Sequence, residues 1–387
     1  MTFETLPDLA SRALGGSVVA ANDEFFAARD NLVNPEPPTF TPRTFGAKGQ
    51  VYDGWETRRR REPGDDHATV RLGVPGVVRG VVVDTAFFTG NYPPYASVEG
   101  CGAEGYPSPD ELTGWFPLVP RAPLHGDTRN LFTVDDPRRV THVRLRIYPD
   151  GGVARLRVHG EALPDPRLLP PGPVDLAAME YGGQVVGCSD MHYGSPANLI
   201  LPGLARVMGE GWETRRRRDD GHDWVEVRLA APGRVRLAEL DTSHFKGNAP
   251  GAAALLGRDA GDWFPLLPRT RLQPDTRHRF RLAGSPPVTH VRLEVYPDGG
   301  MARLRLYGDI APPERDLLAL RWFNALPADQ ALAVAGLLPE AAARALVAGR
   351  PLTDPTRLDL GSARHFDGQP RHFSRCDHPF VVRDEVV

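Results

Sequence analysis

The sequence is poor in cysteine and contains no cysteine motif. Its three cysteines, Cys101, Cys188 and Cys376, lie far apart and have no C-x-x-C spacing, which argues against both a zinc motif and a disulfide framework. A sparse and odd number of cysteines is typical of free thiols in a reducing compartment. We therefore expect a cytoplasmic protein.

The sequence also lacks a long apolar run and an excess of charge of either sign. No uncharged stretch approaches the roughly 18 apolar residues of a membrane span, and the opening MTFETLPDLASRALGG has no apolar core of signal-peptide length. Lys plus Arg number 46 against 49 Asp plus Glu, for a net charge of -3. This balance gives no general attraction to nucleic acid or to an anionic membrane, so we expect neither as a partner. Any anion must be bound by a local arrangement of charges.

Glycine and proline, in contrast, are abundant. The 387 residues include 40 Gly and 39 Pro, and 41% of the chain is hydrophobic. This composition indicates a globular chain with many turns, and favours short strands over long helices. The length is enough for two or three domains, each with its own core.

An internal repeat determines the domain organisation. Four blocks occur twice in the same order: residues 15–33 match 182–200, 54–61 match 211–218, 84–93 match 241–250, and 115–121 match 263–269. In the first pair, GGSVVAANDEFFAARDNLV matches GGQVVGCSDMHYGSPANLI. In the third pair, DTAFFTGNYP matches DTSHFKGNAP. The spacing between blocks changes only in Pro-rich and Gly-rich stretches of the first copy, which are insertions of the kind that surface loops tolerate.

Apolar and charged residues alternate through the repeated blocks, as on a strand with one buried face. In VTHVRLRIYPDGGVARLRVHG, apolar residues occupy every second position on both sides of PDGG: Val143, Leu145, Ile147, Ala154, Leu156 and Val158. We read this stretch as a hairpin with one dry face. Short strands at this spacing, without intervening helices, predict an all-β protein made of two tandem jelly-roll β-sandwiches.

The domain boundaries follow from the repeat. We expect a first sandwich over 1–163, a second over 174–310, and a tail over 311–387, with the proline-dense stretch between the sandwiches as a linker. The tail is rich in Ala and Leu, which predicts two or three short helices broken at Pro327 and Pro339 and then an irregular C-terminus. It is too small for a core of its own, so it should pack against the sandwiches or a neighbouring subunit.

Polar residues clustered in the matched turns are the candidate site residues. In GWETRRRR, an extended backbone would place Glu213, Arg215 and Arg217 on one face, where a guanidinium could grip a carboxylate. The alternative is a solvated edge strand whose arginines prevent sheet pairing. In GHDW, His222 and Asp223 could form a proton-transfer pair, although adjacent residues of a strand point to opposite sides.

The block DTSHFKGN crowds four polar groups of different type into one turn. They are Asp241, His244, Lys246 and Asn248. Each could contact a ligand, or could do ordinary turn chemistry by bonding backbone amides. Where the second copy has His222, His244 and Lys246, the first has Asp65, Phe87 and Thr89. Catalysis needs groups that exchange protons near neutral pH, so the second copy is the better candidate for an active site.

These blocks, in this order, resemble the allantoicase (allantoate amidinohydrolase) family over about residues 3–308. The resemblance rests on DLASRALGG, NDEFFAARDNL, both copies of GWETRRRR, DTAFFTGNYP, GHDW, DTSHFKGN and both YPDGG turns. It implies galactose-binding-like jelly rolls, assembly as a homo-oligomer, and hydrolysis of allantoate to ureidoglycolate and urea during purine breakdown. In the tail, FNALPADQALAV followed by AGRPLTD resembles the opening of the ureidoimidazoline decarboxylases, but the stretch is too short to be that domain.

The implied release of urea suggests a set of roles. Arg215 would bind the substrate carboxylate, Asp241 would be a further substrate-binding residue, and either His222 or His244 would protonate the departing nitrogen. The proton of the water would pass to Glu213 or Asp223, and the ureido oxygens would be bonded by Lys246 and Asn248.

Several alternatives stay open at this point. No cofactor is required by the sequence, but His222, Asp223 and His244 could instead hold a divalent metal that activates the water. A pair of jelly rolls that only binds a sugar or a small acidic ligand is one alternative to the enzyme. A structural assembly protein whose arginine runs form interface salt bridges is another.

Overall fold

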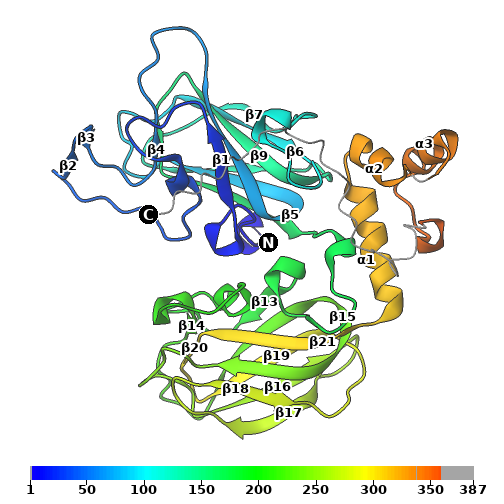
Figure 1. Ribbon diagram of the computed structural model, residues 1–387. Helices are drawn as coiled ribbons and strands as arrows, with labels where there is room; N and C mark the ends of the chain where they lie inside the picture. Colours follow the sequence, from blue (N-terminus) through cyan, green and yellow to red (C-terminus); the bar gives the residue numbers. More distant parts are fainter. Residues whose placement is uncertain (1, 337, 359–387) are drawn as a thin grey trace, which may run out of the picture.

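The computed structural model describes residues 2–336 and 338–358, which form two β-sandwiches joined by a linker, with a helical tail along one side (Figure 1). Within the described residues only three short α-helices occur, and none is long and apolar enough to cross a membrane. The all-β class expected from the alternation is therefore confirmed.

The first sandwich is built on one long strand, β5 (Asp66–Asp84), which takes part in both layers. Its first half pairs with β1 and β9, and β9 leads on to β6 and β7; its second half pairs with β8 and β11. The bounds of these strands are β1 Ser17–Ala21, β6 Tyr95–Cys101, β7 Phe116–Pro123, β8 Arg129–Thr133, β9 Arg139–Tyr148 and β11 Arg155–Ala162. The register shifts after Arg71 and resumes at Gly76, where Gly and Pro let the strand bend from one layer to the other.

The second sandwich repeats this plan around β15 (Asp223–Asp241). Its first half pairs with β13 and β19, which leads to β16 and β17, and its second half with β18 and β21. The bounds are β12 Val174–Asp175, β13 Gln184–Cys188, β16 Ala252–Arg258, β17 Phe264–Arg271, β18 Arg277–Arg281, β19 Val288–Tyr296 and β21 Arg303–Ile310. Two further short pairs close the ends: β4 (Trp55–Glu56) with β10 (Gly152–Val153), and β14 (Trp212–Glu213) with β20 (Gly300–Met301).

The expected hairpin around PDGG is wrong, although its buried face is right. Val143, Leu145 and Leu156 are fully buried. However, β9 pairs with β5 and β6, whereas β11 pairs with β5 alone and the two strands do not pair with each other. The turn carries the chain from one layer to the facing layer, and both strands point their apolar side chains into the shared core. Alternation shows which side of a strand is buried but not which sheet the strand joins.

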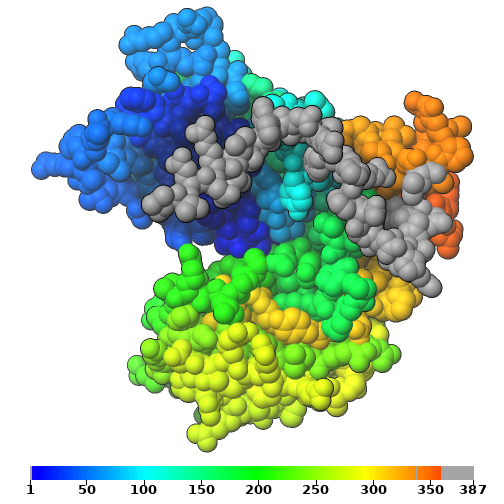
Figure 2. All heavy atoms as spheres, in the orientation of Figure 1, coloured from blue at the N-terminus to red at the C-terminus, as the bar shows by residue number. Residues whose placement is uncertain are grey.

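The long insertion of the first copy forms a protruding arm. Residues 34–53 carry the short pair β2 (Phe45–Gly46) and β3 (Gly49–Gln50) and extend beyond the sandwich at the left of the space-filling view (Figure 2). This confirms that the insertion is a surface loop.

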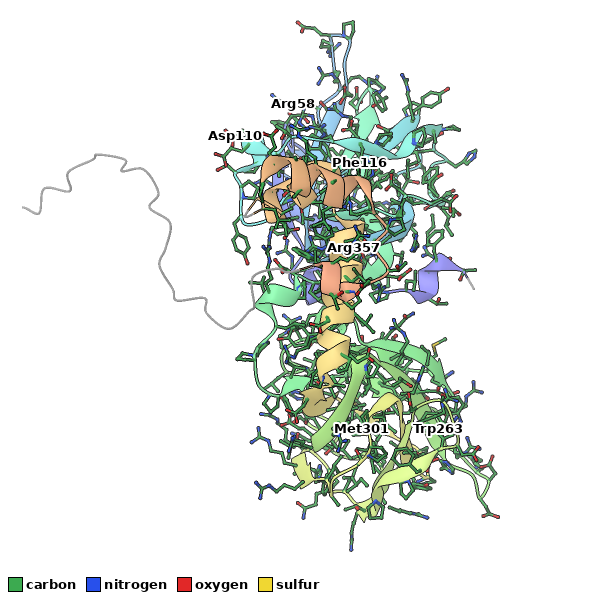
Figure 3. All side chains as sticks on the ribbon, turned by 90° about the vertical axis from the view of Figure 1, so that its right-hand side faces the viewer. Arg58, Asp110, Phe116, Trp263, Met301 and Arg357 are labelled. Carbon is green, nitrogen blue, oxygen red and sulfur yellow. The ribbon has the colours of Figure 1, made fainter. Side chains whose placement is uncertain are left out.

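The tail contains three helices that begin and end near the expected prolines. They are α1 (Pro312–Ala325), α2 (Ala328–Val334) and α3 (Glu340–Ala348), with Pro327 and Pro339 preceding the second and third. Helix α1 runs across the junction of the two sandwiches (Figure 3) and contacts both the linker and β15. Residues 359–387, which include Cys376 and the expected irregular C-terminus, lie outside the described part of the chain.

The tail packs mainly on the first sandwich. The indole of Trp322 is fully buried in a separate cluster that includes Val77 of β5, and Arg167 of the linker lies over its ring at 4.7 Å from the centroid. The backbone N–H of Glu104 donates to Gln330 Oε1 at 3.2 Å. Of the two expected partners of the tail, the sandwiches and a neighbouring subunit, the structure shows contacts with the sandwiches.

Candidate active site

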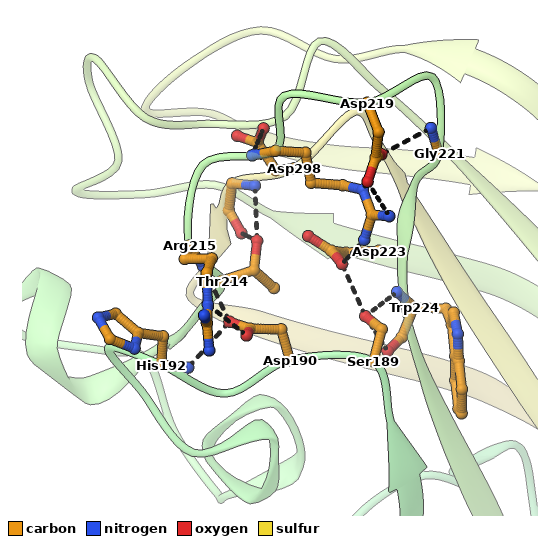
Figure 4. Close-up of polar contacts among 12 residues, drawn as sticks. Ser189, Asp190, His192, Thr214, Arg215, Asp219, Gly221, Asp223, Trp224 and Asp298 are labelled. Carbon is orange, nitrogen blue, oxygen red and sulfur yellow. Dashed lines mark hydrogen bonds and ion pairs between the residues drawn. The ribbon is translucent and has the colours of Figure 1, made fainter.

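The candidate residues lie at one end of the second sandwich, on four connecting segments. These are the loop after β13, the segment from β14 to β15, the loop between β15 and β16, and the turn between β19 and β20. Figure 4 shows labelled residues of the first, second and fourth of these segments. Strand ends bring loops that are distant in sequence to the same edge, which is why blocks 189–194, 213–223, 242–250 and 297–299 meet.

Arg215 is held along one edge of its guanidinium by Asp190. Its backbone N–H donates to Asp190 Oδ1 at 2.9 Å, and its Nε donates to Asp190 Oδ2 at 3.0 Å (Figure 4). The side chain remains 67% exposed, and within the described residues its Nη atoms have no hydrogen-bond partner. An arginine fixed in this way presents the Nη edge of its fork to solvent, which is the geometry that receives a carboxylate.

Asp190 is itself fixed and ionised. Burial alone would raise its pKa, but the backbone N–H groups of Arg215 and His192 and the charge of Arg215 lower it below the usual value. The indole Nε1 of the fully buried Trp212 donates to the carbonyl of Asp190 at 2.8 Å. The loop after β13 is therefore tied to the start of β14, and Arg215 is oriented by a rigid partner.

Glu213 shares a hydrogen bond with Asn248 from the facing loop. The amide Nδ2 of Asn248 donates to Glu213 Oε1 at 2.6 Å and lies 3.3 Å from the sulfur of Met208. Glu213 and Arg215 are two residues apart, and an extended segment turns such residues to the same side. The half-buried carboxylate of Glu213 keeps its second oxygen, Oε2, without a hydrogen bond among the described residues, so this oxygen can accept a proton.

His244 occupies an unusual backbone position. Its φ is 73°, in the left-handed region that side chains other than glycine rarely adopt, and its N–H donates to Asp275 Oδ1 at 2.7 Å. The ring Nε2 lies 2.9 Å from the carbonyl oxygen of Ala205. A carbonyl can only accept, so Nε2 carries the hydrogen and Nδ1 is the atom left for proton exchange in the neutral ring. Lys246 on the same loop is exposed.

Three predicted residues lie apart from this group: Asp223, Asp241 and, as described below, His222. Asp223 is 1% exposed and accepts hydrogen bonds from Arg217 Nη1 at 2.8 Å and Ser189 Oγ at 2.9 Å, which makes it a support under the arginine segment (Figure 4). Asp241, also 1% exposed, ends β15 and caps the following turn through the N–H of Ser243. Both carboxylates are therefore built into the scaffold.

His222 points to the other side of β15. Its ring lies 4.6 Å from that of Tyr296, and its Nε2 is 3.4 Å from Glu294 Oε1. Burial and the hydrogen bond to Glu294 raise the pKa of Tyr296 to about 12. The structure thus brings Glu213, Arg215 and Asn248 together, and His244 adjoins them through its loop.

The three residues suggested as metal ligands do not share a contact that would bring them around one ion. His222, Asp223 and His244 each contact a separate set of residues, and within the described ranges no group of three or more His, Cys, Asp or Glu is arranged to hold a metal ion. The residues present do not fit a metal site.

The sequence reasoning missed two residues of the site, Asp190 and His192. Asp190 matches Asp23 of the first copy, which holds Arg58 in the same way at 2.7 Å. His192, on the loop next to Arg215, matches Phe25. Both follow from aligning the two copies, which share the Asp and the Arg, whereas the first copy has Phe25 where the second has His192.

A cleft of about 530 Å³ lies elsewhere, between β15 and α1, and is lined by residues such as Arg228, His290 and Arg321. It contains none of the predicted site residues. We place the candidate site at the loop end because the free arginine fork and the half-buried carboxylate occur there.

Comparison with known proteins identifies the family of this chain. The family model of the allantoicase repeat matches residues 7–163 and 174–311. A probable allantoicase of Nocardia farcinica is 61% identical over 314 residues, which cover 80% of this chain and 95% of that protein, and one of Streptomyces coelicolor is 50% identical, covering 83% and 90%. The crystal structure of allantoicase from Saccharomyces cerevisiae has a TM-score of 0.70 and 34% identity, covering 79% and 96%. The chain therefore belongs to the allantoicase family.

Proposed function

We propose that the protein hydrolyses allantoate to ureidoglycolate and urea at the loop end of the second sandwich. The observation that carries this proposal is the exposed Arg215 fork, held by Asp190 two residues from the half-buried carboxylate of Glu213. An anion-binding fork and a proton acceptor on one rigid segment are what hydrolysis of a small ureido acid requires. The allantoicase relatives support the choice of substrate.

In the proposed reaction, the bond from the central carbon to one ureido nitrogen breaks. The substrate carboxylate docks on the free Nη edge of Arg215, which places the central carbon above the 213–215 segment. Water adds its oxygen to this carbon, loses one proton to Glu213, and the departing urea nitrogen gains one proton from His244. The net consumption is one water, and the two protein groups then exchange protons with solvent.

The remaining residues assist these two. Asn248 orients the Glu213 carboxylate through Oε1, so that Oε2 faces the water. The exposed ammonium of Lys246, two residues along the loop from His244, would donate to a ureido oxygen as charge develops. His222, Asp223 and Asp241 take supporting roles in this scheme, because their contacts direct them into the scaffold or to the far side of β15.

A direct test is to incubate the full chain with allantoate and to measure urea. We expect one urea per allantoate consumed, and Glu213→Gln should abolish the release while the protein stays folded. Undiminished activity after exhaustive chelation would agree with the metal-free scheme. If allantoate binds without urea release, the protein is a binding module rather than a hydrolase.

We also propose that the chain works as a homo-oligomer in the cytoplasm. Exposed apolar side chains surround the loop end, and a second subunit would cover them: Met191, Tyr193, Leu204, Val207 and Met208. Light scattering of the purified protein should give a mass that is a multiple of 42.4 kDa. A monomer at all concentrations would contradict this.

A further inference from the structure

The first sandwich reproduces the polar framework of the second at its own loop end. Arg58 Nε donates to Asp23 at 2.7 Å, as Arg215 does to Asp190. Glu56 Oε1 accepts from Asn91 at 2.7 Å, matching the pair Glu213 and Asn248. In Figure 1 the two ends, marked by β4 and by β14 with β20, lie on the side of the molecule away from the helices.

A purely structural arginine would use its guanidinium internally, as Arg60 and Arg155 of the same sandwich do. Arg60 Nη1 pairs with the buried Asp66 at 2.6 Å, and Arg155, 2% exposed, donates from both Nη atoms to Asp53. Arg58 differs, because its side chain is 65% exposed and only the Nε edge of its guanidinium has a hydrogen-bond partner within the described residues. The first copy therefore keeps an Nη edge of Arg58 without a hydrogen bond in the described part of the chain.

The insertion of the first copy brings a second cation to the Phe25 ring, which Arg58 also contacts. Lys48 Nζ lies 5.0 Å from the centroid of the Phe25 ring, and Arg58 Cζ lies 5.3 Å from the same centroid. The insertion is held in place by Phe40, which stacks on Phe87 at 5.6 Å. Within the residues that the structure describes, no carboxylate pairs with Lys48.

The two lysines of this chain are Lys48 and Lys246, and both stand exposed at the loop end of a sandwich, one in each copy. All other basic side chains besides histidine are arginines. Each loop end thus combines a fork held by an aspartate with one exposed ammonium. The two ends differ in their aromatic and titratable groups, because Phe25 and Phe87 stand where the second copy has His192 and His244.

We propose that the loop end of the first sandwich is a second binding site for a small ureido carboxylate, without hydrolytic activity. The carboxylate binds to Arg58 and Lys48, and the ureido group lies beside the partly exposed ring of Phe25. With phenylalanine in place of both histidines, this site has no group to protonate a departing nitrogen. The ligand class rests on the function proposed for the second copy.

Isothermal titration of the full chain with hydantoate, a ureido carboxylate that has no second ureido group to lose, tests this directly. We expect two sites per chain, one site in Arg58→Ala, and a first-copy site about fivefold weaker in Lys48→Ala. Arg59→Ala is the matched control, because Arg59 is an exposed neighbour without an ion pair in the described part of the chain, and it should keep two sites. Circular dichroism verifies that each variant is folded.

The same variants separate this site from the proposed activity. Arg58→Ala should release urea from allantoate at the wild-type rate, since it leaves the second copy untouched. One hydantoate site or none in the wild type, or two sites in Arg58→Ala, would overturn the proposal. Failure of the hydrolytic function would show instead as absence of urea release, whatever the number of hydantoate sites.

Discussion

Removing the free fork of Arg215 should weaken catalysis without weakening the fold. In Arg215→Ala, the substrate carboxylate loses two charge-assisted hydrogen bonds, whereas the backbone N–H at this position still reaches Asp190. Hydrogen bonds to charged groups contribute about 1.5–3 kcal/mol each. Because the side chain is 67% exposed, water screens part of this energy, and we take about 2–3 kcal/mol for the pair.

This energy corresponds to a loss of about 30- to 150-fold in kcat/KM for allantoate. Urea release, measured at substrate concentrations below and above KM, gives both kinetic constants. Arg215→Lys should fall between the wild type and the alanine variant, because lysine keeps the charge but cannot form two parallel bonds.

Arg216→Ala is the matched control, since Arg216 carries the same charge one residue further along and is exposed. It should retain kcat/KM within about threefold, as expected for a surface charge. The reasoning is refuted if Arg215→Ala keeps wild-type kcat/KM, or if Arg216→Ala loses as much.

Three further changes test other parts of the structure. His244→Phe should lower kcat about 100-fold or more with little change in melting temperature, because Phe87 already adopts φ 69° at the matched position, and Phe87→His should leave kcat unchanged. Burial raises the pKa of Glu56 above its usual value of 4.5 in the folded state, so the ionised carboxylate destabilises the fold at higher pH, and this penalty disappears as the pH falls. Glu56→Gln should therefore raise the melting temperature near neutral pH but not at about pH 4, as measured in calorimetric scans. Trp322→Ala should lower the free energy of unfolding by about 3–5 kcal/mol in urea denaturation, because it empties a fully buried position under the tail.

Most of the fold prediction rested on the internal repeat. Two copies of the same alternation, separated by loop-like insertions, could only be two sandwiches of the same plan, and the long strands β5 and β15 occupy the same place in each. The expected pairing across PDGG failed because periodicity records burial and not partners. Which strand lies beside β9 depends on the bend in β5, a long-range property of the packed chain.

Sequence neighbours decide the geometry of the predicted residues that the structure brings together. Glu213 and Arg215 share one side of an extended segment, as their spacing requires. His222 and Asp223 separate for the same reason, since adjacent residues of a strand face opposite ways. Asp190 was missed because it lies 25 positions from Arg215, and only the pairing of β13 with β15 brings the two together.

The tail couples the thermal unfolding of the two sandwiches. A linker alone would let each sandwich melt at its own temperature, but α1 contacts β15 of one, and its buried Trp322 closes on Val77 of the other. Melting of the first sandwich would strip this helix of its apolar cover, and the second would then lose the helix as well. Cooperative melting of the whole molecule follows from one helix shared between two cores.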